Sequence, residues 1–320
     1  MEYLIEKVSG FQPVTVDKVH AKFDSILVPK EELRKGDVAL FGIPFEGMTY
    51  NPVGARAGPK GIREAFESCR PYNSILKMDI TETIRVADIG NIDVEPLDYD
   101  ETFRRVDGVL KEVLKQGWVP ILLGGSHSIT EGTVKTFSKH FGGKIGLLWL
   151  DAHPDTMESY HGDIHFCGCP LLRLIEDGAV RAENVVHIGI RGFTNSKATI
   201  DKIDELGVNV FNMDFVRRNG IDQTMEKALK IVKDGTKAFY TTLDIDVVEG
   251  GLVPGTQSPN PGGLMPLEIM EMARKASLAG SEAFDIVCVA PPVDVAQMTT
   301  KLAASLVLEM MTGVAYRSRK

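Results

Sequence analysis

Eight short runs of apolar residues recur along the chain from about residue 36, and segments with helical periodicity lie between them. The apolar runs fall near residues 38–43, 84–88, 119–123, 145–150, 185–190, 208–211, 238–245 and 285–290. Examples of the helical segments are residues 99–116, 126–140, 266–279 and 297–312. Continuous apolar strands are typical of sheets buried on both faces. The alternation therefore predicts an α/β fold, in which a doubly wound, mainly parallel eight-stranded sheet carries helices on both faces.

The same pattern predicts that residues 1–320 form a single domain, because no Ser-, Gly- or Pro-rich linker interrupts it. Pro266 suits the first turn of a helix, and Gly280 suits the position after the end of that helix. The first 35 residues lack a clear pattern. We expect them to form an N-terminal arm that contacts a neighbouring subunit.

Composition narrows the range of partners. A net charge of −8 and a pI near 5.5 argue against binding to nucleic acid or to an anionic membrane surface. The first residues lack the apolar stretch of a signal peptide, and no run reaches the ~18 apolar residues of a membrane span. The four cysteines do not form a disulfide scaffold in so long a chain, and they are Cys69, Cys167, Cys169 and Cys288. We expect a cytoplasmic protein whose partner is a small molecule.

Side chains that bind metals follow three of the predicted strands, those near residues 119–123, 145–150 and 238–245. These side chains are His127, Asp151, His153, Asp155, Asp244 and Asp246. In open α/β sheets, ligands bind at the carboxyl ends of the strands. Four carboxylates crowded there would repel one another unless cations neutralise them. Six oxygen and nitrogen donors exceed the needs of one ion, so they indicate two divalent ions that share bridging carboxylates.

The segment from Val247 to Leu264 starts just after these candidate ligands and contains five glycines and three prolines. It has neither helical nor strand periodicity. Long irregular loops inside a compact domain are usually functional. We therefore expect this loop to form a wall of the pocket beside the metal ions.

Three motifs together resemble the signatures of the ureohydrolase family, which includes arginase and agmatinase. They are GGSHS (124–128), DAHPD (151–155) and DIDVVEGGLVPGTQSPNPGGL (244–264). Further motifs follow in the family's order, namely GIPFEGMTYNPVGARAGPKGIREA (42–65), HIGIRG (187–192) and VAPPVD (289–294). The likeness covers about residues 37 to 315 and is strongest to agmatinase-like members. It implies the three-layer arginase-like fold, and it implies that residues 42–58 support the site. Arg56 and Arg63 are candidate partners of an anion or a carboxylate, although surface arginines are the commoner case, and we expect them at the surface.

The resemblance also implies roles for the candidate ligands. One ion would be held by His127, Asp151, Asp155 and Asp244, and the other by His153, Asp151, Asp244 and Asp246. Mn²⁺ is the usual metal of the family, and Ni²⁺ is the alternative. A water between the ions would become hydroxide near neutral pH, attack a guanidinium carbon and release urea. Asp246 would steady the proton in transit. The family likeness further implies a hydrolase of linear amidines that assembles as a homo-oligomer, a trimer or a hexamer.

Two changed positions concern the substrate side of the expected pocket. Cys288 stands where the family has a glutamate that pairs with the guanidinium, and a thiol cannot form that bidentate ion pair. The family's loop histidine aligns with Cys167 or with His165, depending on the register, and His161 lies close by. We predict that His165 is the proton shuttle and that Cys167 and Cys288 face the substrate.

Two further departures concern the surroundings of the metals. Ser126 replaces a frequent acidic residue before the first ligand histidine, and we expect it to tune the metal from behind the ligands. Glu249 and Gly250 replace a common Asp-Pro pair and would reshape the pocket loop.

Three functions remain open from the sequence. The first is an amidinohydrolase that releases urea from a small guanidino compound. The second is a metal hydrolase of the same fold that cleaves another C–N bond, in an amidine, formimino, ureido or cyclic amide group, and Cys288 favours it. The third is a non-catalytic family member, which the intact set of six ligands disfavours. The two cysteines also allow a softer metal, a different substrate or redox sensitivity.

Overall fold

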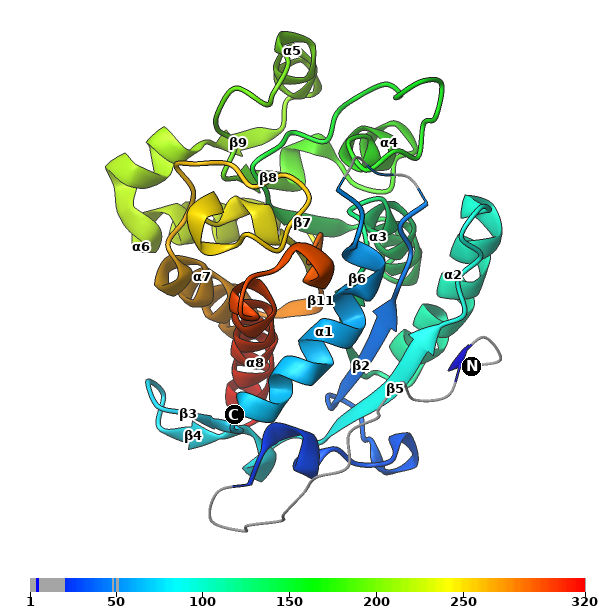
Figure 1. Cartoon of the computed structure of the whole chain (residues 1–320), viewed down its shortest axis with the longest axis vertical. Coiled ribbons are helices and arrows are strands. Elements are labelled where there is room, and N and C mark those ends of the chain that lie inside the picture. The colour runs from blue at the N-terminus through cyan, green and yellow to red at the C-terminus, as the bar shows by residue number, and fades with distance from the viewer. Residues whose placement is uncertain (1–3, 6–20, 48, 50–51, 320) are drawn as a thin grey trace.

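A central sheet runs through the molecule in the computed structural model, which describes residues 4–5, 21–47, 49 and 52–319 (Figure 1). Its spatial order is β1–β5–β2–β6–β11–β10–β7–β8–β9, and only the pairing of β1 with β5 is antiparallel. The strands are β1 (Leu4–Ile5), β2 (Val38–Ile43), β5 (Val86–Ile92), β6 (Val119–Gly124), β7 (Ile145–Leu150), β8 (Val185–Ile188), β9 (Asn209–Phe211), β10 (Ala238–Asp244) and β11 (Ser281–Val287). A separate hairpin pairs β3 (Tyr72–Asn73) with β4 (Met78–Asp79).

All eight predicted strands are confirmed as the parallel part of the sheet, and β1 adds a two-residue antiparallel edge. The largest shift in boundaries concerns β11, which starts at Ser281 and ends at Val287 instead of covering residues 285–290. Cys288 explains the end of the strand, because its φ of 63° lies in the left-handed region and turns the chain out of the extended conformation.

Helices cover both faces of the sheet, as predicted (Figure 1). Helices α7 and α8 pack against each other with α1 beside α8, whereas α2 packs on α3 and α3 on α4. The helices are α1 (Gly58–Ala65), α2 (Tyr99–Lys115), α3 (Ile129–His140), α4 (Pro170–Glu176), α5 (Lys197–Leu206), α6 (Met213–Val232), α7 (Pro266–Leu278) and α8 (Met298–Ser318). Helix α8 continues past Gly313, where a side chain would collide with Ser277 of α7. Close packing of the two helices therefore explains this glycine.

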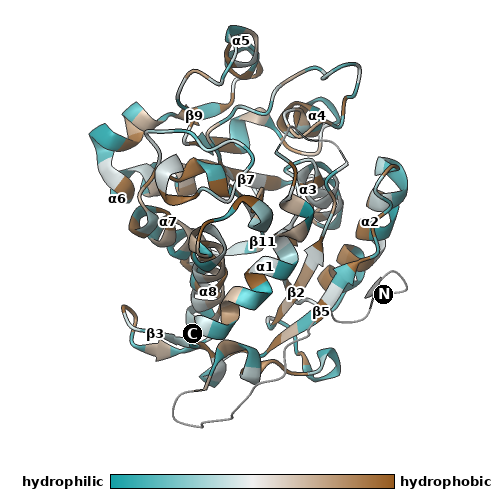
Figure 2. Cartoon of the chain, viewed as in Figure 1, coloured by the Kyte–Doolittle hydropathy of each residue, from teal (hydrophilic) through white to brown (hydrophobic). Residues whose placement is uncertain are grey.

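The core lies between the sheet and its helices. Every residue of β2, β6, β7 and β10 is buried, which agrees with their continuous apolar runs. Trp149, Tyr240 and Phe41 are among the largest fully buried side chains. Figure 2 shows hydrophilic and hydrophobic residues side by side on α2 and α6, as expected for helices with one face in the core and one in solvent.

The strand order explains why distant segments meet in one place. Strands β6, β11, β10 and β7 lie next to one another and run parallel, so their carboxyl ends share one edge of the sheet. The predicted helix at residues 126–140 begins only at Ile129, because a turn at residues 126–128 first carries the chain away from β6. That turn holds His127 at the edge of the sheet.

Two expectations about the outer parts of the chain have different outcomes. Arg63 is not a surface residue, because its guanidinium is largely buried and forms two hydrogen bonds of 2.6 and 2.8 Å with Asp88. Arg56 does lie at the surface, with its side chain 67% exposed.

Most of the predicted N-terminal arm, residues 1–3 and 6–20, lies outside the described residues. Among the described residues, the structure has no helix with the length and apolar character needed to cross a membrane.

Candidate metal centre

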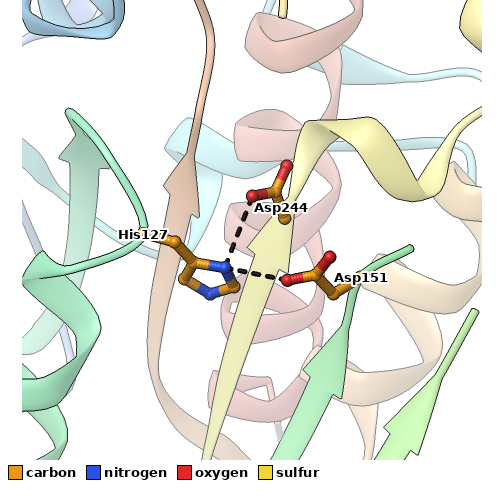
Figure 3. Close-up of side chains that lie close together, drawn as sticks. All are labelled: His127, Asp151 and Asp244. Carbon is orange, nitrogen blue, oxygen red and sulfur yellow. Dashed lines mark ion pairs between the residues drawn. The ribbon is translucent and has the colours of Figure 1, made fainter. Parts of the chain in front are cut away.

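The six predicted metal ligands converge at the carboxyl ends of three strands. His127 follows β6, Asp151 follows β7, and Asp244 is the last residue of β10. Figure 3 shows these three side chains pointing toward one another from their separate strands. His153, Asp155 and Asp246 lie two to four residues further along the same chain segments, in turns that bend back to this edge. All four carboxylates are buried.

The first group of donors surrounds the imidazole of His127. Its Nδ1 atom lies 2.9 Å from Asp151 Oδ2, 3.0 Å from Asp155 Oδ2 and 3.3 Å from Asp244 Oδ2. Asp155 adopts a left-handed backbone conformation, with a φ of 51°, that few residues other than glycine take up. The amides of Leu171 and Leu172, in the first turn of α4, donate to the carbonyl of Asp155 and hold it there. Such strained residues cluster at functional sites.

The second group adjoins the first through Asp151. His153 Nδ1 lies 3.1 Å from Asp246 Oδ2 and 3.3 Å from Asp151 Oδ1. Ligand atoms of His127, Asp151 and Asp244 lie within 4.8 Å of one another, and so do those of Asp151, His153 and Asp246. The two oxygens of Asp151 thus serve two neighbouring groups, as a bridging carboxylate would.

Hydrogen bonds behind His127 show that this arrangement suits a cation. Asp285 Oδ1 accepts a hydrogen bond of 2.5 Å from the Thr242 hydroxyl, so Thr242 Oγ1 is free to accept from His127 Nε2 at 3.0 Å. This order of donors places the imidazole proton on Nε2 and leaves a lone pair on Nδ1. Nδ1 and Asp155 Oδ2 are both buried without a hydrogen-bond partner of acceptable geometry among the described residues. A lone pair that faces three carboxylates needs a positive charge between them, and divalent ions fit this donor set.

The titration behaviour of the metal-free groups points to the same need. Burial opposes protonation of His127, but the facing carboxylates of Asp151, Asp155 and Asp244 outweigh it and raise the pKa of His127 well above 6.5. Burial, with Asp244 second, raises the pKa of Asp246 to about 7. Protons thus accumulate on this cluster when no metal balances the carboxylates, and metal binding would release them.

Several supporting residues were not recognised in the sequence. Trp149 stacks on His127 at a ring distance of 4.4 Å, and its indole N–H donates to Asp151 Oδ2 at 3.2 Å. His187 Nε2 bonds the carbonyl of His153 at 2.7 Å. Asp285 also accepts hydrogen bonds from Tyr240 and Thr130. These residues lie inside apolar strands or helices, so the periodicity of the sequence assigns them to the core and gives no sign of their contacts with ligands.

A cavity of about 410 Å³ opens beside the ligands. His127, His153, Asp155, Asp244 and Asp246 line one side, and Gln257 and Ser258 of the loop at residues 247–264 line another, as predicted for that loop. Arg191 fastens this loop, because its guanidinium donates to the carbonyls of Asp246, Val248, Asn260 and Pro261. Thr49, which precedes the described residues 52–58, also lines the cavity.

The predicted substrate-side residues divide into two sets. Cys167 and Cys288 both line the cavity, and Cys288 is buried. Burial, followed by the nearby Asp244 and Asp246, raises the pKa of the Cys288 thiol well above its ordinary value. His165 is not among the cavity-lining residues: its ring stacks on Tyr99 at 3.9 Å, and its Nδ1 lies 2.9 Å from Glu131 Oε2. Its role as a proton shuttle stays a prediction, and this geometry does not favour it.

Ser126 and Glu249 are the two other positions that depart from the family pattern, and each has a hydrogen-bond partner in the structure. Ser126 is buried, and its hydroxyl lies 2.7 Å from that of Ser128 in the turn that carries His127. Glu249 accepts hydrogen bonds from the amides of Gly262 and Gly263 and so closes the pocket loop on itself. Both residues therefore shape the backbone that presents ligands or cavity residues.

An α/β sheet with paired histidine–carboxylate groups at the carboxyl ends of its strands defines a metal-dependent hydrolase site of the binuclear type. The chain matches the arginase family over residues 36–313, and it belongs to that family. It is 30% identical to guanidinopropionase from Pseudomonas aeruginosa, over 86% of this chain and 85% of that protein. It is 31% identical to the mitochondrial guanidino acid hydrolase of Homo sapiens, over 87% of this chain and 78% of that protein.

Solved structures agree with this assignment. Formimidoylglutamase from Bacillus subtilis superposes with a TM-score of 0.88 and 26% identity, covering 98% of this chain and 97% of that one. The predicted ureohydrolase likeness and the arginase-like fold are thus confirmed. The chain is a hydrolase of the arginase family, whose members among these relatives cleave C–N bonds of linear amidines.

Proposed function

We propose that this protein is an amidinohydrolase that releases urea from a small guanidino compound with the help of two divalent ions. The observation that carries the proposal is the pair of donor groups joined by Asp151, in which Nδ1 of His127 faces three carboxylates. Named relatives that hydrolyse guanidino acids support the substrate class.

In this proposal, His127, Asp151, Asp155 and Asp244 hold one ion, and His153, Asp151, Asp244 and Asp246 hold the other. The carboxylate and imidazole donors are compatible with Mn²⁺, with Ni²⁺ as the alternative. The bound ions would supply a water activated for attack near neutral pH. Proton transfer and binding of the substrate would then depend on the side chains that line the cavity.

Asp246 is the residue that we propose to hold the proton in transit. Its Oδ1 accepts a hydrogen bond from the Ala152 amide at 3.2 Å, which fixes the carboxylate, while its Oδ2 faces His153 at 3.1 Å. A carboxylate that is fixed on the cavity wall can take a proton from the attacking water and pass it to the departing amine.

A second candidate is hydrolysis of a different C–N bond, such as that of a formimino group. One observation favours it: Cys288 offers the cavity a buried neutral thiol where the family likeness predicted a glutamate. A thiol cannot replace the bidentate ion pair between carboxylate and guanidinium. The likeness to formimidoylglutamase is compatible with this reading.

The test is to measure urea and ammonia release by protein loaded with Mn²⁺ or Ni²⁺. The panel contains agmatine, arginine, guanidinobutyrate, guanidinopropionate, guanidinoacetate, formiminoglutamate and free guanidine. Urea from one guanidino compound supports the first candidate, whereas ammonia or formamide without urea supports the second. If no compound of the panel is cleaved by protein that binds two ions per chain, the second candidate is favoured, and compounds with a ureido or cyclic amide group are tested next. Cys288→Glu then shows whether a restored carboxylate brings back guanidine hydrolysis.

We also propose a homo-oligomer, a trimer or hexamer, with the N-terminal arm at a subunit contact, and a reducing cytoplasm as its compartment. The four free cysteines of the described residues suit such a compartment. Light scattering of the protein with and without residues 1–20 measures the oligomer and the contribution of the arm.

A further inference from the structure

The cavity beside the ligands is uncharged apart from the ligands themselves, as far as the described residues go. Its other lining side chains are neutral, among them Thr49, Cys167, Asn195, Thr199, Gln257 and Cys288. A carboxylate or ammonium group at the far end of a substrate would therefore meet no opposite charge on this wall.

Charged residues close to the wall already have partners within the protein. The carboxylate of Glu46 accepts hydrogen bonds from the amides of Gly54, Ala55 and Arg56 at 2.5, 2.6 and 3.2 Å. The guanidinium of Arg191 is used by the carbonyls of the pocket loop. Neither group has its charge directed at the cavity, and each would lose structural hydrogen bonds if it turned toward a ligand.

Gln257 is the wall residue that is best placed to bind the reacting end of a substrate. It lies next to Thr256, which forms an antiparallel bridge with Val289, so Gln257 stands opposite Cys288. Its Nε2 donates to Glu46 Oε1 at 3.0 Å and to the Pro52 carbonyl at 3.3 Å. Because both partners are acceptors, the orientation of the amide is fixed, and Oε1 is left without a donor among the described residues.

We propose, building on the proposed function, that the substrate is a small guanidine or amidine with an uncharged far end, and that Gln257 Oε1 accepts the N–H groups of its reacting end. A charged far end would give up its hydration on entering this neutral cavity without gaining an ion pair. An uncharged hydroxyl or amide instead finds Thr199, Asn195 and Thr49 on the wall. The protein would thus select against substrates with a charged far end, because the cavity offers that charge no oppositely charged partner.

Three substrates of equal length test the far end. All three carry the same guanidinium group, and their far ends differ: 3-guanidinopropanamide has a neutral amide, 3-guanidinopropanoate an anionic carboxylate and 3-guanidinopropylamine a cationic ammonium group. We expect the kcat/KM of the Mn²⁺-loaded enzyme for the amide to exceed both others by roughly tenfold or more. Urea release that is as fast from either charged compound overturns the inference and leaves the proposed function intact. Urea from none of the three, nor from the panel above, with two ions bound, overturns the proposed function itself.

Gln257→Met tests the acceptor, because methionine keeps the length of the side chain and removes the amide oxygen. We expect KM for the amide substrate to rise by about tenfold, with kcat within about threefold and metal content unchanged. A role limited to fastening the loop of residues 46–56 would instead lower the thermal midpoint or the metal content and leave KM unchanged. That second result would remove Gln257 from the binding site.

Discussion

The two halves of the metal centre differ in how their histidines are fixed. His127 is 1% exposed, and its proton is positioned through Thr242 and the buried carboxylate of Asp285. The side chain of His153 is 20% exposed, and its Nε2 lies 3.1–3.3 Å from the neutral groups of Asn260, Ser258 and Thr194. The half around His127 is therefore buried and preorganised by charge, whereas the half around His153 is partly open to solvent. We infer that an ion is held more tightly in the buried half, and that exchange of metal and substrate occurs in the open half.

The largest effect should come from removing the carboxylate that joins the halves. Asp151→Asn takes a negative charge from both donor groups, so we expect metal content to fall below one ion per chain. Activity should fall by on the order of 10³-fold, because the activation of water depends on both ions. Metal analysis of the purified variant, together with urea release, measures both losses. A variant that keeps two ions would show that Asp151 is not shared.

Removing one histidine at a time should separate the halves. His153→Ala should leave about one ion per chain, since the buried group around His127 is intact. His127→Ala should cost more, because it leaves three buried carboxylates facing one another with one fewer donor. Titration of metal-free protein with Mn²⁺, followed by calorimetry, gives the number of sites and their affinities. Equal losses in the two variants would contradict the difference between the halves.

A smaller effect is expected from the residue behind His127. Thr242→Val removes the acceptor that keeps the proton on Nε2, and we expect metal affinity in the buried half to weaken by about 10–100-fold. Thr241→Val is the matched control. Thr241 is the preceding residue of β10, and its hydroxyl pairs with that of Ser281, away from the ligands. If both variants weaken metal binding equally, the contact with His127 has no specific role.

The smallest effect concerns Glu131, which anchors His165 beside α3. Burial would raise the pKa of Glu131, but hydrogen bonds from His165 and Lys135 outweigh it and lower the pKa below 4.5. A carboxylate with a lowered pKa stabilises the fold above pH 4.5 and loses this contribution as the pH falls. Glu131→Gln should therefore reduce the free energy of unfolding at pH 7 by about 1 kcal/mol, with a smaller difference at pH 4. Urea denaturation at both pH values is the measurement, and an equal difference at both would contradict the assignment.

Activity gives a further use for the same variant. If His165 were the proton shuttle, Glu131→Gln would change the pH profile of kcat, because the substitution removes the charged partner of the imidazole. An unchanged profile would limit His165 to fastening its loop against Tyr99 and α3.

The sequence predicted most about the segments whose role depends on neighbours along the chain. Residues 145–150 read as a buried strand, and Asp151, His153 and Asp155 follow at once, so strand and candidate ligands were predicted together. Arg63 shows the limit. From the sequence, a carboxylate partner was the less common alternative and a surface position the expected one, and no nearby residue pointed to Asp88, 25 residues further along the chain.

By itself, therefore, the sequence determined the α/β architecture, the family and the positions of the six candidate ligands along the chain, because periodicity and motif are local properties of the chain. Only the tertiary structure decided which groups stand behind and beside those donors. Thr242 and Asp285 reach His127 from β10 and β11, and Gln257 stands opposite Cys288 across a bridge between two loops. Such contacts depend on how segments that are far apart in the sequence pack together. The type of one residue therefore does not indicate which residue it contacts in the folded chain.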